Sequence, residues 1–422
     1  MHKIKNSLSA VLLLCLFCIL TGCTRKEDRI VIWTSNSEFA PYVEYYNKTH
    51  KSKAVLVYKE NPAASLPPVN QDDCPDLVIG PLLRNEKTTS NFHSIDFLFD
   101  RKFISHNSFY KILLKSGQKG FTQYLLPVSF NLPVLIFSNE NKSLISNSYT
   151  ISLDEMQKIG AEYNKKDKRG RYTNIGFAPQ SSDDFLYTVA KIKGASFKEG
   201  KKGEFTWNKE GLASSIAYLN NWITNSNTDN QTENDFVYKY LSVTDDKRVI
   251  SGRSLLAFTT SDKLFSFSKE QLSKIDFRWL ENDGLVPVED EMIMMGIARK
   301  AKNVNGASKF ISWFYSVETQ KNLLEHTNND KLEVNTFGIA NGFSAIREVN
   351  ERILPVYYTT LLTNIPQTGT FKVAEKKPAR WQQIKAKVVL PYLKDSVNSV
   401  PGKKITTLEE HYSDFKKQRY NQ

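Results

Sequence analysis

Ile30-Val31-Ile32-Trp33-Thr34, followed at once by Ser35-Asn36-Ser37, is the stretch that decides the class of fold. A short run of β-branched and aromatic residues predicts a buried strand. The three polar residues are good helix N-caps, and Phe39 to Tyr46 has the character of a helix. Two further strands are predicted at Ala54 to Tyr58 and at Asp76 to Gly80. Strand, helix and strand in this order predict an α/β fold with a largely parallel sheet.

Strand and helix signals continue to alternate along the rest of the chain. Ser152 and Glu155 have the spacing of a capping box, so a helix is expected to begin there. Thr224 to Asp235 is polar and lacks apolar periodicity, and we expect a solvated loop. Leu132 to Phe137 is another apolar run with polar residues on either side. A strand is also predicted at Ser254 to Thr259, and helices are predicted at Asp183 to Ile192, Asn208 to Ile223, Asn303 to His326 and from Pro378 onward.

The first residues have the pattern of an export signal. Lys3 and Lys5 give a positive start, and Val11 to Leu20 is an unbroken apolar run. A membrane-spanning helix needs about 20 apolar residues, so this run fits a secretory signal peptide instead. Leu20-Thr21-Gly22-Cys23 follows directly and resembles the bacterial lipobox, in which the cysteine is acylated. We therefore expect a signal peptide at 1–22, lipidation at Cys23 and a tether at 23–28.

Length and composition favour two lobes held together by their own cores. The chain has 422 residues, more than one ordinary domain, and its hydrophobic content of 40% is enough for substantial cores. Cys15 and Cys18 lie in the signal peptide, so lipidation of Cys23 leaves Cys74 alone. We expect no internal disulfide and a buried, unreactive Cys74.

The charge pattern narrows the classes of partner and of chemistry. The net charge of +12 favours anionic partners such as lipid headgroups, wall polymers or an acidic ligand. No nucleic-acid module surrounds the densest basic cluster, so we expect a solvated turn and no nucleic-acid partner; the cluster consists of Lys165, Lys166, Lys168, Arg169 and Arg171. The six histidines lack metal-ligand spacing, and there is no G-x-S-x-G elbow or phosphate loop. We predict no enzyme, no metal site and no cofactor.

A resemblance to a known family rests on the order of several segments. The segments are Ile30 to Thr34, Leu126 to Asn131, Leu135 to Asn139, Ser152 to Glu155, Ser251 to Leu256, Leu285 to Ala298, Ala307 to Gln320, Gly342 to Arg347, Pro378, Trp381 and Thr406 to Glu410. Taken in order, they resemble the extracellular solute-binding proteins of ABC importers, in particular the family that includes maltose-binding protein. Two departures stand out: Glu291-Met292-Ile293 replaces small residues near a crossing between lobes, and Leu255-Leu256 replaces an Ala-Met pair.

The resemblance implies a two-lobed periplasmic-binding-protein fold of α/β class, with a central interlobe cleft and a helical C-terminus. Crossings between the lobes are expected near Pro127 to Asn131, Val286 to Gly296 and Asn335 to Gly342. The N-lobe would take 29–128 plus 290–335, and the C-lobe 129–289 plus 336–422.

Ligands of open parallel sheets lie beyond the carboxyl ends of the strands, which in two-lobed binders places the site between the lobes. The loop after the first strand offers a flat aromatic face and helix-opening N–H groups; its candidates are Trp33, Ser35, Asn36 and Glu38. The other candidates are Ser129 and Asn131 at the first crossing, then Thr259, Thr260, Ser261 and Asp262, with Glu291, Glu289 and Gly284 weaker. The structural alternatives remain open: Trp33 as a core residue, Ser35 and Asn36 as caps, and Ser129 and Asn131 as backbone partners at a hinge.

Signal, composition and resemblance together predict one function. It is lipid-anchored, extracytoplasmic binding of a small, carbohydrate-like solute by lobe closure, with delivery to the membrane permease of an ABC transporter. The expected location is the cell membrane or envelope. The alternative is a surface lipoprotein of the same fold that acts in adhesion or sensing, which the positive charge allows.

Overall fold

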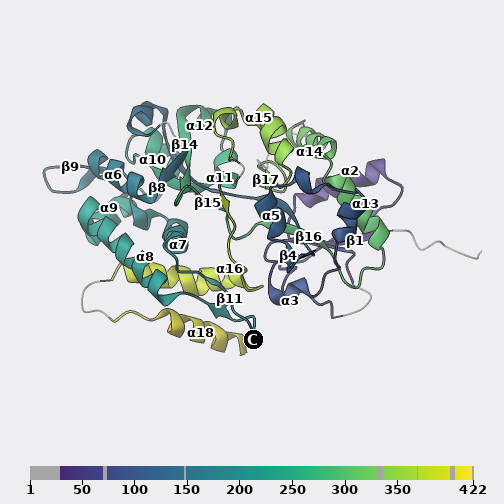
Figure 1. The fold of residues 1–422 in the computed structure, drawn as a ribbon. Helices are drawn as coiled ribbons and strands as arrows, with labels where there is room; N and C mark the ends of the chain where they lie inside the picture. The colour runs from purple at the N-terminus through teal and green to yellow at the C-terminus, as the bar shows by residue number, and fades with distance from the viewer. Residues whose placement is uncertain are drawn as a thin grey trace, which may run out of the picture.

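The computed structural model describes residues 29–69, 74–146, 149–329, 336–367, 369–399 and 404–420. The predicted signal peptide, the lipidated Cys23 and the tether lie outside the described residues. Figure 1 shows two groups of helices and strands side by side, one around the larger sheet with β1 and β16 and the other around the smaller sheet with β8 and β14. The mixed α/β composition and two-lobed arrangement that we predicted are confirmed.

The N-terminal strands build the parallel half of the larger sheet. β1 (Ile30–Thr34) lies between β2 (Ala54–Tyr58) and β3 (Leu77–Gly80) and runs parallel to both. α2 (Phe39–Thr49) connects the first two strands and buries Phe39, Tyr42 and Tyr46. The predicted strand-helix-strand unit is therefore present, because the apolar strand residues pack directly beneath this helix.

Three antiparallel strands complete the larger sheet, whose order is β17-β6-β16-β3-β1-β2. β16 (Ile293–Ile297) inserts between β3 and β6 (Leu126–Phe130), and β17 (Phe343–Ser344) pairs with the outer side of β6. Residues 343–344 thus share a sheet with the N-terminal strands, although they fall in the segment that we assigned to the C-lobe. The lobe boundaries as a whole stay a prediction.

The smaller sheet has the order β13-β7-β14-β8. β7 (Pro133–Ser138) is antiparallel to β13 (Ala257–Thr260) and to β14 (Ile275–Glu281), and β8 (Thr150–Ser152) runs parallel to β14. Every residue of β7 is buried; β13 and β14 pair with its two edges, and α10 (Asp245–Ile250) and α11 (Ser261–Phe265) contact it. The other helices of this lobe include α6 (Leu153–Tyr163), α7 (Asp183–Ile192), α8 (Lys209–Asn221) and α12 (Lys269–Lys274).

The chain passes between the two sheets in short extended segments. Only 131–132 separate β6 from β7, and 288–292 lead from β15 (Val286–Pro287) to β16. β18 (Phe371–Lys372) pairs in parallel with β15, and Figure 1 shows this pair running between the two groups of elements. The tail then forms α16 (Trp381–Ile384), the π-helical turn η8 (Lys385–Val389), α17 (Leu390–Val397) and α18 (Leu408–Tyr420).

The segment after β18 also holds the two lobes together from outside. Arg84 Nη2 donates to the carbonyl of Ala374 at 2.5 Å, and Lys376 Nζ lies 2.7 Å from Glu86 Oε1. The backbone N–H of Glu86 in turn donates to Glu199 Oε2 at 2.9 Å. These contacts join α3 (Glu86–Thr89), on the side of the larger sheet, to the hairpin of β11 (Lys198–Glu199) and β12 (Phe205–Thr206).

Most of the predicted helices are present. Ser152 Oγ accepts from the N–H of Glu155 at the start of α6, and α7 has the predicted bounds. The segment predicted as one helix from Asn303 forms two, α13 (Val304–Phe314) and α14 (Val317–Asn329). The remaining elements are the helices α4 (Asp96–Asp100), α5 (Lys111–Lys115) and α15 (Leu354–Tyr357), the strands β4 (Gln118–Lys119), β5 (Thr122–Gln123), β9 (Lys165–Lys166) and β10 (Tyr172–Asn174), and the turns η2 (His106–Ser108), η3 (Asn139–Leu144), η4 (Pro179–Ser181), η6 (Val349–Ile353) and η7 (Thr359–Thr363).

The predicted solvated loop at Thr224 to Asp235 is wrong. A π-helical turn, η5 (Trp222–Asn227), and α9 (Asn230–Lys239) occupy this segment. Its polar side chains are used inside the protein: Asn227 Nδ2 donates to the buried Glu233 carboxylate at 2.8 Å and to the carbonyl of Phe177 at 3.0 Å. The prediction was wrong because polar residues that form hydrogen bonds inside a protein have the same composition as those of a solvated loop.

Two other expectations are met in the described part of the chain. The basic cluster forms the exposed hairpin of β9 and β10, and Cys74 is buried. In the ranges given above, no helix is both long and apolar enough to cross a bilayer.

Asp76 is a buried carboxylate that ties three segments together. Its side chain is 3% exposed; Oδ2 accepts from the N–H of Val31 at 2.9 Å and Oδ1 from the N–H of Asn303 at 2.8 Å. Asp76→Ala leaves both N–H groups unpaired and should lower the free energy of unfolding by about 2–3 kcal/mol in denaturant titrations. Asp395→Ala, at an exposed helical position, should change it by no more than about 0.5 kcal/mol. Equal unfolding midpoints for the two variants would contradict this role.

Candidate ligand-binding cleft

A cavity of about 250 Å³ lies where the two sheets meet. Both groups of elements and the crossings between them contribute to its walls. The lining residues are Asn36, Ser129, Phe130, Ile293, Ala340 and Asn341 on the side of the larger sheet, Thr260 and Asp262 on the side of the smaller sheet, and Asn131, Glu289, Asp290, Glu291, Trp381 and Lys385 from crossings and tail. A movement of one lobe against the other would therefore change the shape of this cavity.

One wall is a network of hydrogen bonds around the first crossing. Asn131 Nδ2 donates to the carbonyl of Asn341 at 2.8 Å, and its Oδ1 accepts from Ser261 Oγ at 2.6 Å. Ser261 Oγ also accepts from the N–H of Leu132 at 3.1 Å. Asn131 thus connects the loop before β17 to the start of α11 across the hinge.

The loop before β17 has left-handed backbone at two successive non-glycine residues. Ala340 has φ 49° and Asn341 has φ 56°, a conformation that costs an alanine roughly 1–2 kcal/mol. The N–H of Ala340 donates to Tyr42 Oη at 3.0 Å, and its carbonyl accepts from Ser129 Oγ at 3.2 Å. Backbone strain of this kind persists only where surrounding contacts enforce it, and it gathers at functional sites.

Asp290 is the centre of a buried ionic network behind the cleft. Its Oδ1 lies 3.2 Å from Lys191 Nζ, and its Oδ2 lies 3.6 Å from Lys377 Nζ. Oδ2 also accepts from Trp381 Nε1 at 3.1 Å and from the hydroxyl of Tyr187. Burial by itself would raise the pKa of Asp290, but the two ammonium groups outweigh it and hold the pKa well below its usual range.

The carboxylates of Glu289 and Glu291, on either side of Asp290, have fewer hydrogen bonds and, among the described residues, no ion pair. Glu289 Oε1 is buried and has no hydrogen-bond partner in the described structure. Burial raises the pKa of Glu289, and the nearby Lys191 offsets this only in part. Glu291 lies at the mouth of the cleft, where loss of solvent likewise raises its pKa although Gln382 Nε2 donates to it at 2.8 Å. The cleft thus contains carboxylates that are not stabilised in their charged form.

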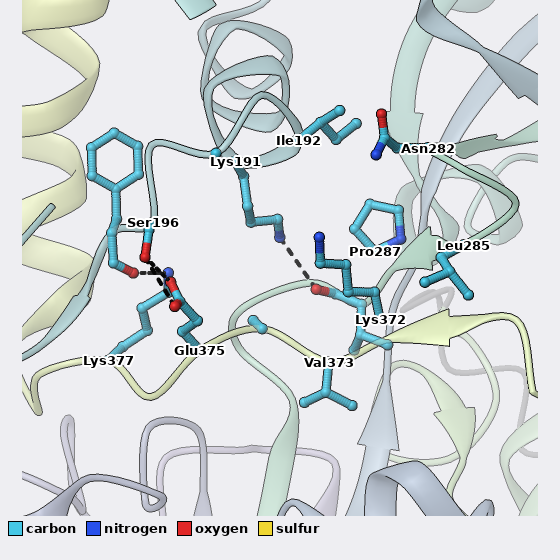
Figure 2. A pocket seen from close by; sticks show the side chains of 14 residues that line it. Lys191, Ile192, Ser196, Asn282, Leu285, Pro287, Lys372, Val373, Glu375 and Lys377 are labelled. Atoms are coloured by element: carbon cyan, nitrogen blue, oxygen red, sulfur yellow. Dashed lines mark hydrogen bonds between the residues drawn. The ribbon is translucent and has the colours of Figure 1, made fainter. Parts of the chain in front are cut away.

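A second cavity, of about 190 Å³, lies behind the cleft (Figure 2). Figure 2 shows Lys191 reaching from α7 toward β15, while Lys372, Val373, Glu375 and Lys377 line the opposite side from the segment that follows β18. Lys191 Nζ donates to the carbonyl of Val288 at 3.2 Å. The residues around this cavity come from the end of α7 and the loop after it, from 282–288 and from 372–377. We therefore place the candidate site in the interlobe cavity, which alone of these two involves the larger sheet.

Comparisons with known proteins agree with this geometry. The family model of bacterial extracellular solute-binding proteins matches residues 106–329, more than half of the chain. The chain belongs to this family. A search of curated proteins by sequence gives no match.

Solved structures share the fold of this solute-binding protein at low sequence identity. The sugar-binding protein MalE of Xanthomonas citri is 11% identical with a TM-score of 0.67, over 92% of this chain and 96% of that one. CpMnBP1, solved with mannobiose bound, is 14% identical with a TM-score of 0.61, over 92% and 100%. The maltose-binding protein MalE of Listeria monocytogenes, in complex with maltose, is 13% identical with a TM-score of 0.59, over 94% and 99%.

The structure brings part of the predicted site together. Seven predicted residues line the cleft: Asn36, Ser129, Asn131, Thr260, Asp262, Glu289 and Glu291. Thr259 and Ser261 are buried next to it, and Ser35 and Glu38 stand near the start of α2 without lining it. Trp33 is 3% exposed within the core, with Lys59 Nζ 4.5 Å from its ring centroid. Its placement favours the alternative in which Trp33 is a core residue.

Sequence reasoning missed the residues that come from distant parts of the chain. Trp381 and Lys385 stand in the C-terminal helices, and Ala340 and Asn341 in the loop before β17. Asp290 escaped notice between two candidates that were named, because an acidic triplet does not reveal which member has buried partners. No local signal marks Trp381 as a neighbour of residue 290, since only the packing of the tail onto α7 brings them together.

Asp290→Asn removes the counter-charge of two buried lysines while keeping the shape of the side chain. The loss should be about 3–5 kcal/mol of unfolding free energy at pH 7. An aspartate whose folded pKa is depressed stabilises the fold above its unfolded pKa of about 3.9 and loses that effect as the pH falls through the folded value. The difference between wild type and variant should therefore shrink below about pH 4.

The matched control is Asp414→Asn, which breaks an exposed ion pair with Lys417. It should shift the unfolding free energy by less than about 1 kcal/mol at any pH. Thermal melts of the purified protein between pH 3 and pH 7 make both measurements. A difference between Asp290→Asn and wild type that did not depend on pH would contradict the ionic role of Asp290.

Proposed function

We propose that this chain is a lipid-anchored, extracytoplasmic binding protein for a small, carbohydrate-like solute, which it delivers to the membrane permease of an ABC transporter. Binding would proceed by closure of the two lobes over the interlobe cavity. Acylated Cys23 would hold the protein at the membrane. Membership of the extracellular solute-binding family supports the general role.

The observation that carries the proposal is the composition of the cavity wall. Asn36 belongs to the loop after β1 of the larger sheet, and Asp262 to α11 beside the smaller sheet. A ligand shifts a conformational equilibrium only by its difference in affinity for the two states. A solute that contacts both residues binds the closed form better than the open form, which is what hinge closure requires.

The size and lining of the cavity support a small polar solute. Its volume of about 250 Å³ lies at or below the lower end of drug-sized pockets, which span about 300–1,000 Å³. Carboxylates, amides and the hydroxyls of Ser129 and Thr260 line the cavity, and the buried rings of Phe130 and Trp381 stand behind them. A wall rich in hydrogen-bonding groups suits a sugar-like molecule with several hydroxyls, and the structural relatives named above were solved with mannobiose or maltose or are described as sugar-binding.

Ligand-induced closure should be visible once the solute is known. Native mass spectrometry of the purified protein should reveal a retained small molecule, and small-angle scattering should show a smaller radius of gyration with ligand than without it. Asp262→Ala should weaken binding by roughly ten- to a hundredfold if its hydrogen bond is buried on closure, without changing the melting temperature of the empty protein. Asp100→Ala, at an exposed position outside the cleft, should leave affinity unchanged. If Asp262→Ala binds the solute with unaltered affinity, Asp262 does not contact the solute and the binding site lies elsewhere.

The anchor has its own test, independent of the ligand. Cys23→Ala should release the protein from the membrane fraction or block its maturation, because a stable tether depends on the acyl chains. Cys18→Ala changes a cysteine inside the apolar run and should leave the protein in the membrane fraction. Fractionation and immunoblotting of cells that express each form show which fraction contains the protein. A membrane fraction that Cys23→Ala does not alter would rule out the lipoprotein assignment.

A further inference from the structure

The cleft is acidic although the protein as a whole is strongly basic. Its lining contains the carboxylates of Asp262, Glu289, Asp290 and Glu291 and the single ammonium of Lys385. The chain carries a net charge of +12, so an acidic lining is not a consequence of overall composition. A wall of one charge sign raises the local concentration of ligands with the opposite sign.

Internal ion pairs do not neutralise this charge. Asp290 is paired with Lys191 and Lys377 behind the cleft, and Lys385 is bonded to Asp184 at 2.8 Å. Across the described residues, no cation lies within ion-pair distance of Asp262, Glu289 or Glu291. Three carboxylates of the cavity lining therefore have no direct ion pair in the part of the chain that the structure describes, and Lys191 and Lys385 compensate the charge of Glu289 only from a distance.

Most hydrogen-bond donors in the lining are already engaged within the protein. Ser129 Oγ and Asn36 Nδ2 both donate to the carbonyl of Ala340, at 3.2 and 3.5 Å. Asn131 Nδ2 donates to Asn341, Trp381 Nε1 to Asp290, and Lys385 Nζ to Asp184. The groups that remain for a ligand are mainly hydrogen-bond acceptors, and these suit a chemical group that only donates hydrogen bonds. An ammonium group has three donors and no acceptor.

Glu289 shows most clearly that a donor belongs in the cleft. Its Oε1 is buried without any hydrogen bond, and an unsatisfied buried polar atom destabilises the protein that carries it. Burial raises the pKa of Glu289, and Asp290 and Asp184 raise it further, against the opposite effects of Lys191 and Lys385. A cation that entered the cleft would stabilise the charged form of this carboxyl group.

We propose that the solute carries an ammonium group, in the manner of an amino sugar, and that Glu289 with Asp262 and Glu291 recognises it. This inference rests on the proposed function, because it concerns the same cleft. Hydroxyl groups of the sugar would use the amides and carbonyls at the hinge, and the ammonium would use the carboxylates. The charge of the solute then becomes the feature by which this protein selects it.

A matched pair of probes tests the requirement for charge. Glucosamine and its short oligomers carry ammonium groups, whereas N-acetylglucosamine and its oligomers have the same ring without the charge. Isothermal titration calorimetry at pH 7 should show binding of the first series at least about tenfold tighter than the second, since charged hydrogen bonds exceed neutral ones by about that factor. Affinity for the charged series should fall as the pH is lowered through the raised pKa values of Glu289 and Glu291, because a protonated carboxyl does not attract an ammonium.

Glu289→Gln isolates the residue at the centre of the proposal. It should weaken binding of the charged series by about tenfold and leave the acetylated series nearly unchanged. Glu60→Gln, at an exposed position outside the cleft, should change neither. The empty Glu289→Gln variant should also melt at a higher temperature than wild type at pH 7. A folded pKa above the unfolded one means that stability is lost as the pH rises through the folded value, so this gain should disappear near pH 4.

The outcomes separate the two claims. If the acetylated series or maltose binds as tightly as the charged series and scattering shows closure, the ammonium requirement is wrong and the proposed function stands. If neither series nor maltose binds, both claims fall. If Glu289→Gln melts like wild type at pH 7, Glu289 carries no burial penalty and the argument for a cationic ligand is overturned.

Discussion

The arrangement of the cleft depends on the ion pairs that the buried carboxylate of Asp290 makes with two lysines. Asp290 stands in the crossing that leads from β15 to β16 and contacts Lys191 of α7 and Lys377 of the tail. The side chains of Tyr187 and Trp381 donate to the same carboxylate. Two buried ammonium groups without a counter-charge would be strongly unfavourable. The carboxylate therefore holds together the crossing before β16, helix α7 and the segment that follows β18.

The two sides of the cleft are held by contacts of different kinds. On the side of Asp290, ionic and aromatic contacts join the tail to α7 and hold the back of the cleft. On the other side, single hydrogen bonds from Asn131 and Ser129 bridge the first crossing and the loop before β17. A hinge needs a few bonds that can change their geometry at little cost. The hydrogen-bonded side has this character, and the strained residues Ala340 and Asn341 lie within it.

The lining of the cleft contains both compensated and uncompensated carboxylates. Asp290 is fully compensated, whereas the neighbouring Glu289 has a buried oxygen without a partner. Evolution tolerates unsatisfied groups where a ligand completes them, because binding then removes the penalty. Adjacent residues in the chain thus differ energetically: the carboxylate of Asp290 is compensated by two ammonium groups, and that of Glu289 has a buried oxygen without a hydrogen bond to any described residue.

The amino-acid sequence by itself determined the class of fold and most of its elements. Strand runs such as Ile30 to Thr34 and caps such as Ser152 are local signals, because side-chain chemistry within a few residues sets the backbone they favour. The order of these elements was enough to indicate the family. Candidates placed at the ends of strands, such as Asn36 and Asp262, came to line the cleft because strand ends mark the edge of a sheet. Local signals failed where polar residues fold inward, as at Asn227 and Glu233.

Only the tertiary structure decided which residues line the cleft. Trp33 has the chemistry of a stacking platform, but α2 and the neighbouring strands bury its side chain. Trp381 and Lys385 reach the cleft because the tail packs against α7, nearly two hundred positions earlier in the chain. Whether an acidic residue is paired or unpaired depends on cations that the fold brings from elsewhere, which is why Asp290 and Glu289 look alike in sequence and differ in the structure. The spacing of apolar residues along the chain predicts local secondary structure. Charge compensation depends instead on residues that are close in space, which the sequence pattern does not show.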